Sequence, residues 1–126
     1  MLSLPSLGEF DRGSRLRIWL ATQPADMRCG FDRLAQLAQS VTGQDPLSGH
    51  LFLFRSRGGD RLKALLWEPD GFVLWYKRLE AGTFRFPRTS DGQTSVQIKP
   101  SELAMLLEGI DLASVKRRPG FERKKT

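Results

Sequence analysis

Two turn signals inside one apolar stretch constrain the fold of this chain more than any other feature. Residues 50–77 are rich in alternating apolar side chains, and Gly58-Gly59 and Glu68-Pro69-Asp70-Gly71 interrupt them. Such sequences form tight turns because they supply the backbone angles that hairpins need. The segment therefore predicts three consecutive antiparallel strands. We expect Arg57 opposite Asp60 across the first turn, and Trp67 opposite Phe72 across the second.

This pairing assigns the side chains of the three strands to two faces, because successive residues of a strand point to opposite sides. One predicted face is wholly apolar and carries Leu51, Leu53, Leu62, Ala64, Leu66, Val73 and Trp75. The other mixes aromatic and apolar with basic residues: Phe52, Phe54, Arg61, Lys63, Leu65, Trp67, Phe72, Leu74 and Tyr76. We expect the first face in the core and interpret the second as a candidate binding surface.

Shorter patterns flank this central segment. Residues 15–21 alternate like a half-buried strand, and residues 82–87 and 94–98 also resemble strands. Asp26 is a candidate N-cap for a helix that Gly43 would end, and Pro100 would open a last helix. The predicted fold class is α+β, an antiparallel meander of about five strands on which a helix from the N-terminal half and a C-terminal helix pack.

The apolar faces of these elements predict the core. It should contain Phe31, Leu34, Leu37, Leu51, Leu53, Leu66, Val73, Trp75, Leu103, Leu106 and Leu107. A chain of 126 residues suits one domain, which we place at residues 1–115 and follow with a flexible basic tail at 116–126. Two helices were expected to cover one face of the sheet and to leave the other for a partner.

Positive charge is segregated along the chain. The net charge is +6 and the pI is about 10.1. Residues 116–126 contribute +5 of this charge, and residues 55–88 hold eight basic against four acidic residues. Such segregation indicates an acidic partner, either nucleic acid or protein.

The supply of catalytic groups is small, since the chain has one histidine, His50, and one cysteine, Cys29. We interpret both as structural, and we expect no enzyme activity, metal site or cofactor. A single cysteine excludes an intramolecular disulfide. The chain has neither a run of about 20 apolar residues nor a secretory leader, so we expect a cytoplasmic protein without a membrane segment.

Four segments carry a family resemblance, namely residues 24–37, 45–55, 60–82 and 103–111, and the most specific run spans Asp70 to Glu80. They resemble the small TnpB-type, or Orf-two-like, accessory proteins of the insertion-sequence-sixty-six group of bacterial transposons. The resemblance implies a role in transposition beside a separate, larger transposase, which would carry the strand-cutting chemistry. It does not define what the small protein does.

Two functions remain open from the sequence. The first is a basic DNA-binding module that assists the transposase, and the second is an interaction module that docks the transposase, or self-associates, without contacting DNA. The predicted contacts to nucleic acid or partner are Arg55, Arg57, Arg61, Lys63, Trp67, Tyr76, Lys77, Arg78, Lys116, Arg117, Arg118, Arg123, Lys124 and Lys125. Basic side chains would hold phosphates or acidic patches, and the aromatic ones would stack or anchor.

Overall fold

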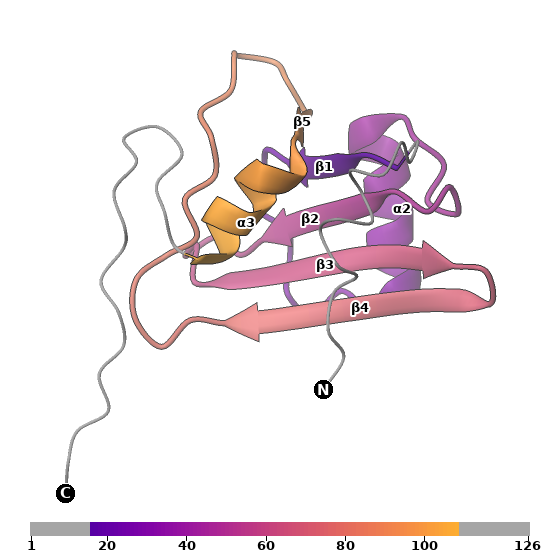
Figure 1. Cartoon of the computed structure of the whole chain (residues 1–126), viewed down its shortest axis with the longest axis horizontal. Helices are drawn as coiled ribbons and strands as arrows, with labels where there is room; N and C mark the ends of the chain where they lie inside the picture. Colours follow the sequence, from indigo (N-terminus) through magenta and orange to yellow (C-terminus); the bar gives the residue numbers. More distant parts are fainter. Residues whose placement is uncertain (1–15, 109–126) are drawn as a thin grey trace, which may run out of the picture.

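The computed structural model describes residues 16–108, which form a five-stranded sheet with one helix on each face (Figure 1). The α+β class is therefore confirmed. In chain order the elements are β1 (Ile18–Ala21), α2 (Phe31–Thr42), β2 (Leu51–Arg55), β3 (Arg61–Glu68), β4 (Gly71–Arg78), β5 (Ser95–Ile98) and α3 (Pro100–Glu108). The predicted tail at 116–126 lies outside the described residues.

The central hairpins have the predicted register. Strands β2, β3 and β4 are antiparallel neighbours, and Trp67 lies opposite Phe72. Arg55 lies opposite Leu62, which is the register that places Arg57 opposite Asp60. The two predicted faces are therefore the real faces of this part of the sheet.

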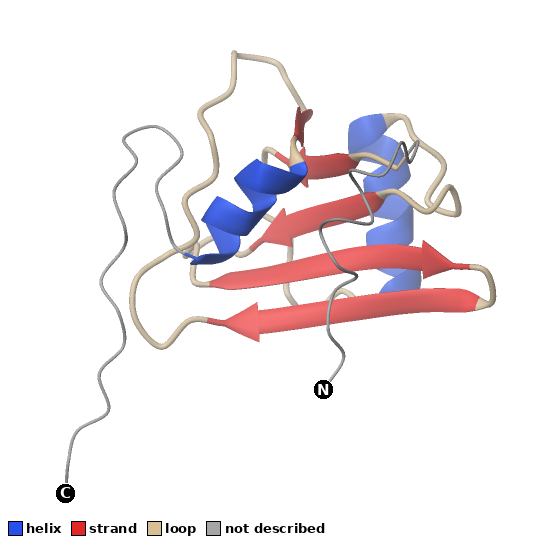
Figure 2. Cartoon of the chain, viewed as in Figure 1, coloured by secondary structure: helices blue, strands red, loops and turns tan. Residues whose placement is uncertain are grey.

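The rest of the sheet differs from a simple meander. Its strand order is β4-β3-β2-β1-β5, and β1 runs parallel to β2 because helix α2 connects the two strands as a crossover. Strand β5 then returns antiparallel along the free side of β1. The predicted strand at residues 82–87 was wrong, since these residues lie in the long β4–β5 loop seen in Figure 2.

Helix α2 covers the aromatic face of the sheet. Leu34, Ala35 and Ala38 are buried in one cluster with the side chains of Phe52, Phe54 and Leu65. The helix ends as predicted at Gly43, whose φ of 69° is favourable for glycine.

The start of α2 was predicted wrongly. Asp26 is not the N-cap, because the helix begins at Phe31 after Gly30. Asp26 instead accepts hydrogen bonds from the backbone and side chain of Arg28, which lower the pKa of its carboxyl to about 2. Phe31 was expected in the core but is 48% exposed. Side chains lean toward the N-terminus of a helix, so the first residue extends past the packed turn.

Helix α3 covers the opposite face. Pro100 stands in its first turn, and the carboxylate of Glu102 accepts the backbone N–H of Lys99 at 3.0 Å, as in one half of a capping box. Leu103 and Leu106 are buried against the β1 and β2 side chains Ile18, Leu20, Leu51 and Leu53. The expectation that one sheet face stays uncovered was therefore wrong, because α2 in the β1–β2 crossover and α3 after β5 lie on different sides of the sheet (Figure 1).

The predicted core is largely confirmed. Six of its members are buried: Leu34, Leu51, Leu53, Leu66, Leu103 and Leu106. Leu37, Trp75 and Leu107 are half-buried and pack against the buried clusters, and Val73 is half-buried. Val73 and Trp75 stay partly exposed because β4 is an edge strand with a neighbour on one side only.

Candidate functional site

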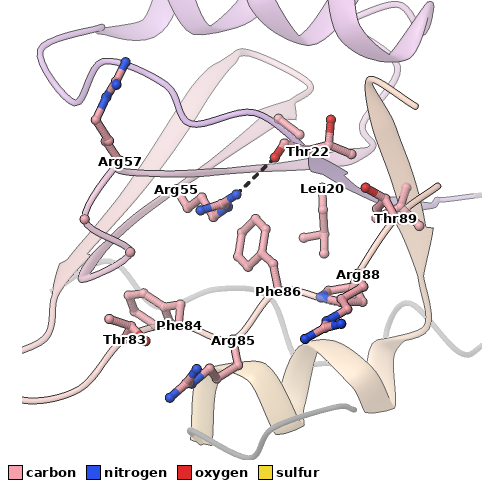
Figure 3. Close-up of a pocket in the computed structure, with 15 residues that line it drawn as sticks. Leu20, Thr22, Arg55, Arg57, Thr83, Phe84, Arg85, Phe86, Arg88 and Thr89 are labelled. Atoms are coloured by element: carbon pink, nitrogen blue, oxygen red, sulfur yellow. Dashed lines mark hydrogen bonds between the residues drawn. The ribbon is translucent and has the colours of Figure 1, made fainter. Parts of the chain in front are cut away.

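A pocket of about 500 Å³ opens at the end of the sheet where β1 and β2 finish (Figure 3). One wall is formed by residues 20–22, Arg55 and the β2–β3 turn at 57–59, and the other wall is the loop segment 83–89. Because β1 and β2 are parallel, their carboxyl ends meet here. Open sheets with parallel strands commonly bind ligands in the crevice outside these ends.

The loop wall is fixed to the sheet by its aromatic residues and by backbone hydrogen bonds. Phe84 is buried among the residues that α3 covers, and Phe86 packs against the same cluster. The backbone N–H of Phe84 donates to the carbonyl of Gly59 at 2.7 Å. The side chains of this loop thus alternate between inside and outside as in a strand, although the loop pairs with no described strand. Arg85 lies between the two inward aromatic residues and is exposed.

Gly59 is the point at which the turn and the loop touch most closely. Its φ is +78°, and an added Cβ would lie 3.3 Å from the Cβ of Thr83. We expect Gly59→Ala to lower the free energy of unfolding by about 1–2 kcal/mol, because an L side chain is strained at positive φ and would push against the pocket wall. Chemical denaturation measures this change. Gly58→Ala is the matched control, since its φ is not positive and an added Cβ would meet only the side-chain Oδ1 of Asp60. Equal stability of the two variants would contradict the argument.

Four arginines line the pocket, and no aspartate or glutamate of residues 16–108 lines it. They are Arg55, Arg57, Arg85 and Arg88. Arg57, Arg85 and Arg88 are exposed, whereas Arg55 is half-buried. Four cations around one hollow give a locally positive potential that favours an anionic ligand.

Arg55 is the inner arginine, and two neighbours hold its guanidinium. Its Nη2 donates to the carbonyl oxygen of Thr22 at 3.2 Å, and its Cζ lies 5.5 Å from the centre of the Phe86 ring. In Figure 3 this guanidinium lies between Thr22 and Phe86, while the other three arginines point outward from the rim. The Nε of Arg55 is buried without a hydrogen-bond acceptor among the described residues.

Lys63, which the sequence predicts as an accessible contact, is buried in the structure. Its side chain is buried, and Nζ donates to the carbonyls of Met27 and Cys29 at 2.6 and 2.7 Å. The ammonium also lies 4.8 Å from the ring centre of Tyr76. All three contacts are internal, so Lys63 ties the segment before α2 to the sheet.

The other predicted contacts are scattered. Trp67 packs edge-on against Phe72 at the β3–β4 turn, at the other end of β3 from Arg61. Tyr76 and Lys77 are exposed on the edge strand β4, and Arg78 pairs there with Glu80 at 3.0 Å. Arg61 borders a second hollow beside Arg57 that also contains Asp26 and Asp60. The structure thus brings Arg55 and Arg57 together and separates them from Trp67.

Arg85 and Arg88 were missed as contacts in the sequence. They were counted in the positive charge of residues 55–88 but assigned no role, because residues 82–87 were expected to pair as a strand. Phe84, which lies in this predicted strand and was not included in the predicted core, is buried. The alternation of phenylalanine and arginine in GTFRFPR was the available signal, since it predicts one apolar and one charged side for this segment.

The contacts of His50 and Cys29 indicate structural roles. The Nδ1 of His50 accepts the backbone N–H of Arg17 at 2.9 Å, and burial, together with the nearby Arg17 charge, lowers the pKa of its imidazole. Cys29 is a free thiol packed against the α2 cluster. Within residues 16–108 no group of three His, Cys, Asp or Glu residues could hold a metal ion. In the same part of the chain no helix has the length and apolar character needed to cross a membrane.

These features define a small α+β fold with an arginine-lined hollow at the carboxyl ends of β1 and β2. Residues 16–117 match the family described as IS66 Orf2 like protein, and the chain belongs to this family. Membership confirms the resemblance and supports an accessory role in transposition.

Two relatives come from Sinorhizobium fredii (strain NBRC 101917 / NGR234), and both are described as uncharacterized proteins. The protein y4jC is 41% identical over 104 residues, which cover 82% of this chain and 87% of the relative. The protein y4hO is 43% identical over 99 residues, which cover 79% and 84%. No solved structure matches the chain.

Proposed function

We propose that this protein is a DNA-binding accessory module that assists the separate transposase of its element in the cytoplasm. The observation that carries the proposal is the arginine pocket, a hollow lined by Arg55, Arg57, Arg85 and Arg88 and by no acidic residue from the described part of the chain. Family membership supplies the context of transposition.

The charge distribution favours DNA, rather than an acidic protein, as the binding partner. Phosphate neutralisation by arginine and lysine releases counterions, which supplies most of the sequence-independent affinity for DNA. The pocket arginines present planar donor groups that suit phosphate oxygens. The tail adds six basic residues within eleven positions.

Fluorescence anisotropy with a labelled duplex from one end of the element tests this proposal. We expect binding at about 50 mM salt, and we expect the logarithm of the affinity to fall linearly with the logarithm of the salt concentration. A duplex of unrelated sequence separates specific from general binding. No binding to either duplex at low salt would overturn the proposal.

The basic tail provides a second measurement. We expect removal of residues 116–126 to leave the melting temperature nearly unchanged, since the tail has little apolar content. DNA affinity should fall and the salt dependence should flatten, because fewer counterions are released. An unchanged affinity and slope in the same anisotropy titration would show that the tail has no electrostatic role.

A second candidate function is protein interaction without DNA. The strand β4 favours it, because no other strand within residues 16–108 pairs with its outer side and Tyr76 is 48% exposed on it. The strand could pair with the transposase or with a second copy. A pull-down from cells expressing the whole element, with and without nuclease, discriminates the two functions, since a transposase that stays bound after nuclease treatment favours direct interaction.

A further inference from the structure

We propose that the arginine pocket is a binding site for a single phosphate group, in which Arg55 is the inner ligand. This inference rests on the proposed function and deepens it, because it assigns one phosphate of the DNA to one place on the protein. General DNA affinity needs only positive charge near the duplex. A phosphate site needs a fixed donor group, and Arg55 has the properties of one.

The hydrogen bonds of Arg55 within the described residues leave most of its donors unused. A guanidinium has five N–H donors, and among the described residues only the bond from Nη2 to the Thr22 carbonyl uses one. Nε is buried without an acceptor. Buried donors in folded proteins nearly always have partners, so an unused donor beside a hollow points to a water or a ligand.

The surroundings of Arg55 favour an anion in that place. Its guanidinium is already oriented by the Thr22 carbonyl and by the Phe86 ring, so little side-chain freedom is lost on binding. Among residues 16–108 no carboxylate lines the pocket and competes with an anion for Arg55. The exposed Arg57, Arg85 and Arg88 can turn toward an anion at the mouth and share its charge.

The size of the pocket allows more than the phosphate itself. A volume of about 500 Å³ also has room for an attached sugar. The phosphate could therefore be the monoester at the end of a strand or a diester within the backbone. Both offer the oxygens that a guanidinium fork recognises.

Two-dimensional NMR of the arginine Nε–H groups in the full chain tests the site directly. We expect the Arg55 signal to shift saturably when a thymidine trinucleotide with a 5′-phosphate is added. The same trinucleotide without the 5′-phosphate distinguishes the sources, because an equal shift indicates a backbone phosphate and a weaker one a strand end. No Arg55 shift with either ligand would overturn the proposal, as would an equal shift with a tetraglutamate peptide.

Arg55→Lys supplies the matching affinity measurement. This variant keeps the charge but loses the planar fork, and we expect it to bind the trinucleotide about tenfold more weakly. Arg17→Lys is the control, because Arg17 lies at the opposite end of β1. Wild-type affinity in a folded Arg55→Lys protein would overturn the site. The NMR experiment needs no variant, so the proposal stays testable if Arg55→Lys does not fold.

The two proposals can fail separately. If the duplex binds with a normal salt slope and the Arg55 signal does not respond, DNA lies elsewhere on the protein and the phosphate site is wrong. If the trinucleotide shifts Arg55 and no duplex binds, the phosphate site stands and the DNA-binding proposal is wrong.

Discussion

Lys63→Glu is expected to be one of the most destabilising single substitutions in this protein. Lys63 is 6% exposed as a whole residue, and its ammonium donates to the carbonyls of Met27 and Cys29. A glutamate would place a buried negative charge beside two carbonyl oxygens and the electron-rich face of Tyr76. We expect the free energy of unfolding to fall by about 3–5 kcal/mol, as when a buried charge loses its partners.

Urea denaturation followed by circular dichroism measures this loss. Lys63→Met keeps most of the apolar stem and should cost less, about 1–3 kcal/mol for two carbonyls left without donors. Arg61→Glu is the matched control on the same strand, since its guanidinium has no hydrogen bond to the described residues. If Lys63→Glu is as stable as Arg61→Glu, the ammonium does not hold the segment before α2.

The double variant Arg85→Gln with Arg88→Gln should produce the largest loss of DNA affinity from the described part of the chain. Both side chains are exposed on the loop wall of the pocket, so their removal should leave the core intact. At about 1 kcal/mol for each phosphate contact, the upper end for exposed ion pairs, the dissociation constant should rise about thirtyfold. The slope of affinity against salt should fall by about 2 in magnitude.

The control removes the same charge from another place. Arg17→Gln with Lys99→Gln changes two exposed cations near the paired residues Ile18 and Ile98, at the end of β1 opposite the pocket. We expect a much smaller change in anisotropy titrations of this protein. If both double variants weaken binding equally, net charge alone governs the affinity and the pocket has no special part in it.

Local patterns in the sequence determined the strand register of the central hairpins and two of the helix ends. The turns at Gly58-Gly59 and Pro69-Asp70 fixed the register of β2, β3 and β4, because strand alternation and turn length leave one pairing that buries the apolar face. Gly43 marked the end of α2, and Pro100 marked the start of α3. These signals act within a few residues, so they can be interpreted without knowing the rest of the fold.

The tertiary structure alone decided which helix covers each face of the sheet and which charged side chains lie close together. Alternation put Arg61 and Lys63 on one face, but only the packing of residues 27–29 over β3 buried Lys63. The pocket joins Arg55 with Arg85 and Arg88, which are separated by 30 or more residues and meet because Phe84 and Phe86 anchor the loop against the sheet. Such contacts depend on the packing free energy of the whole domain, and periodicity along one segment carries no information about its distant neighbours.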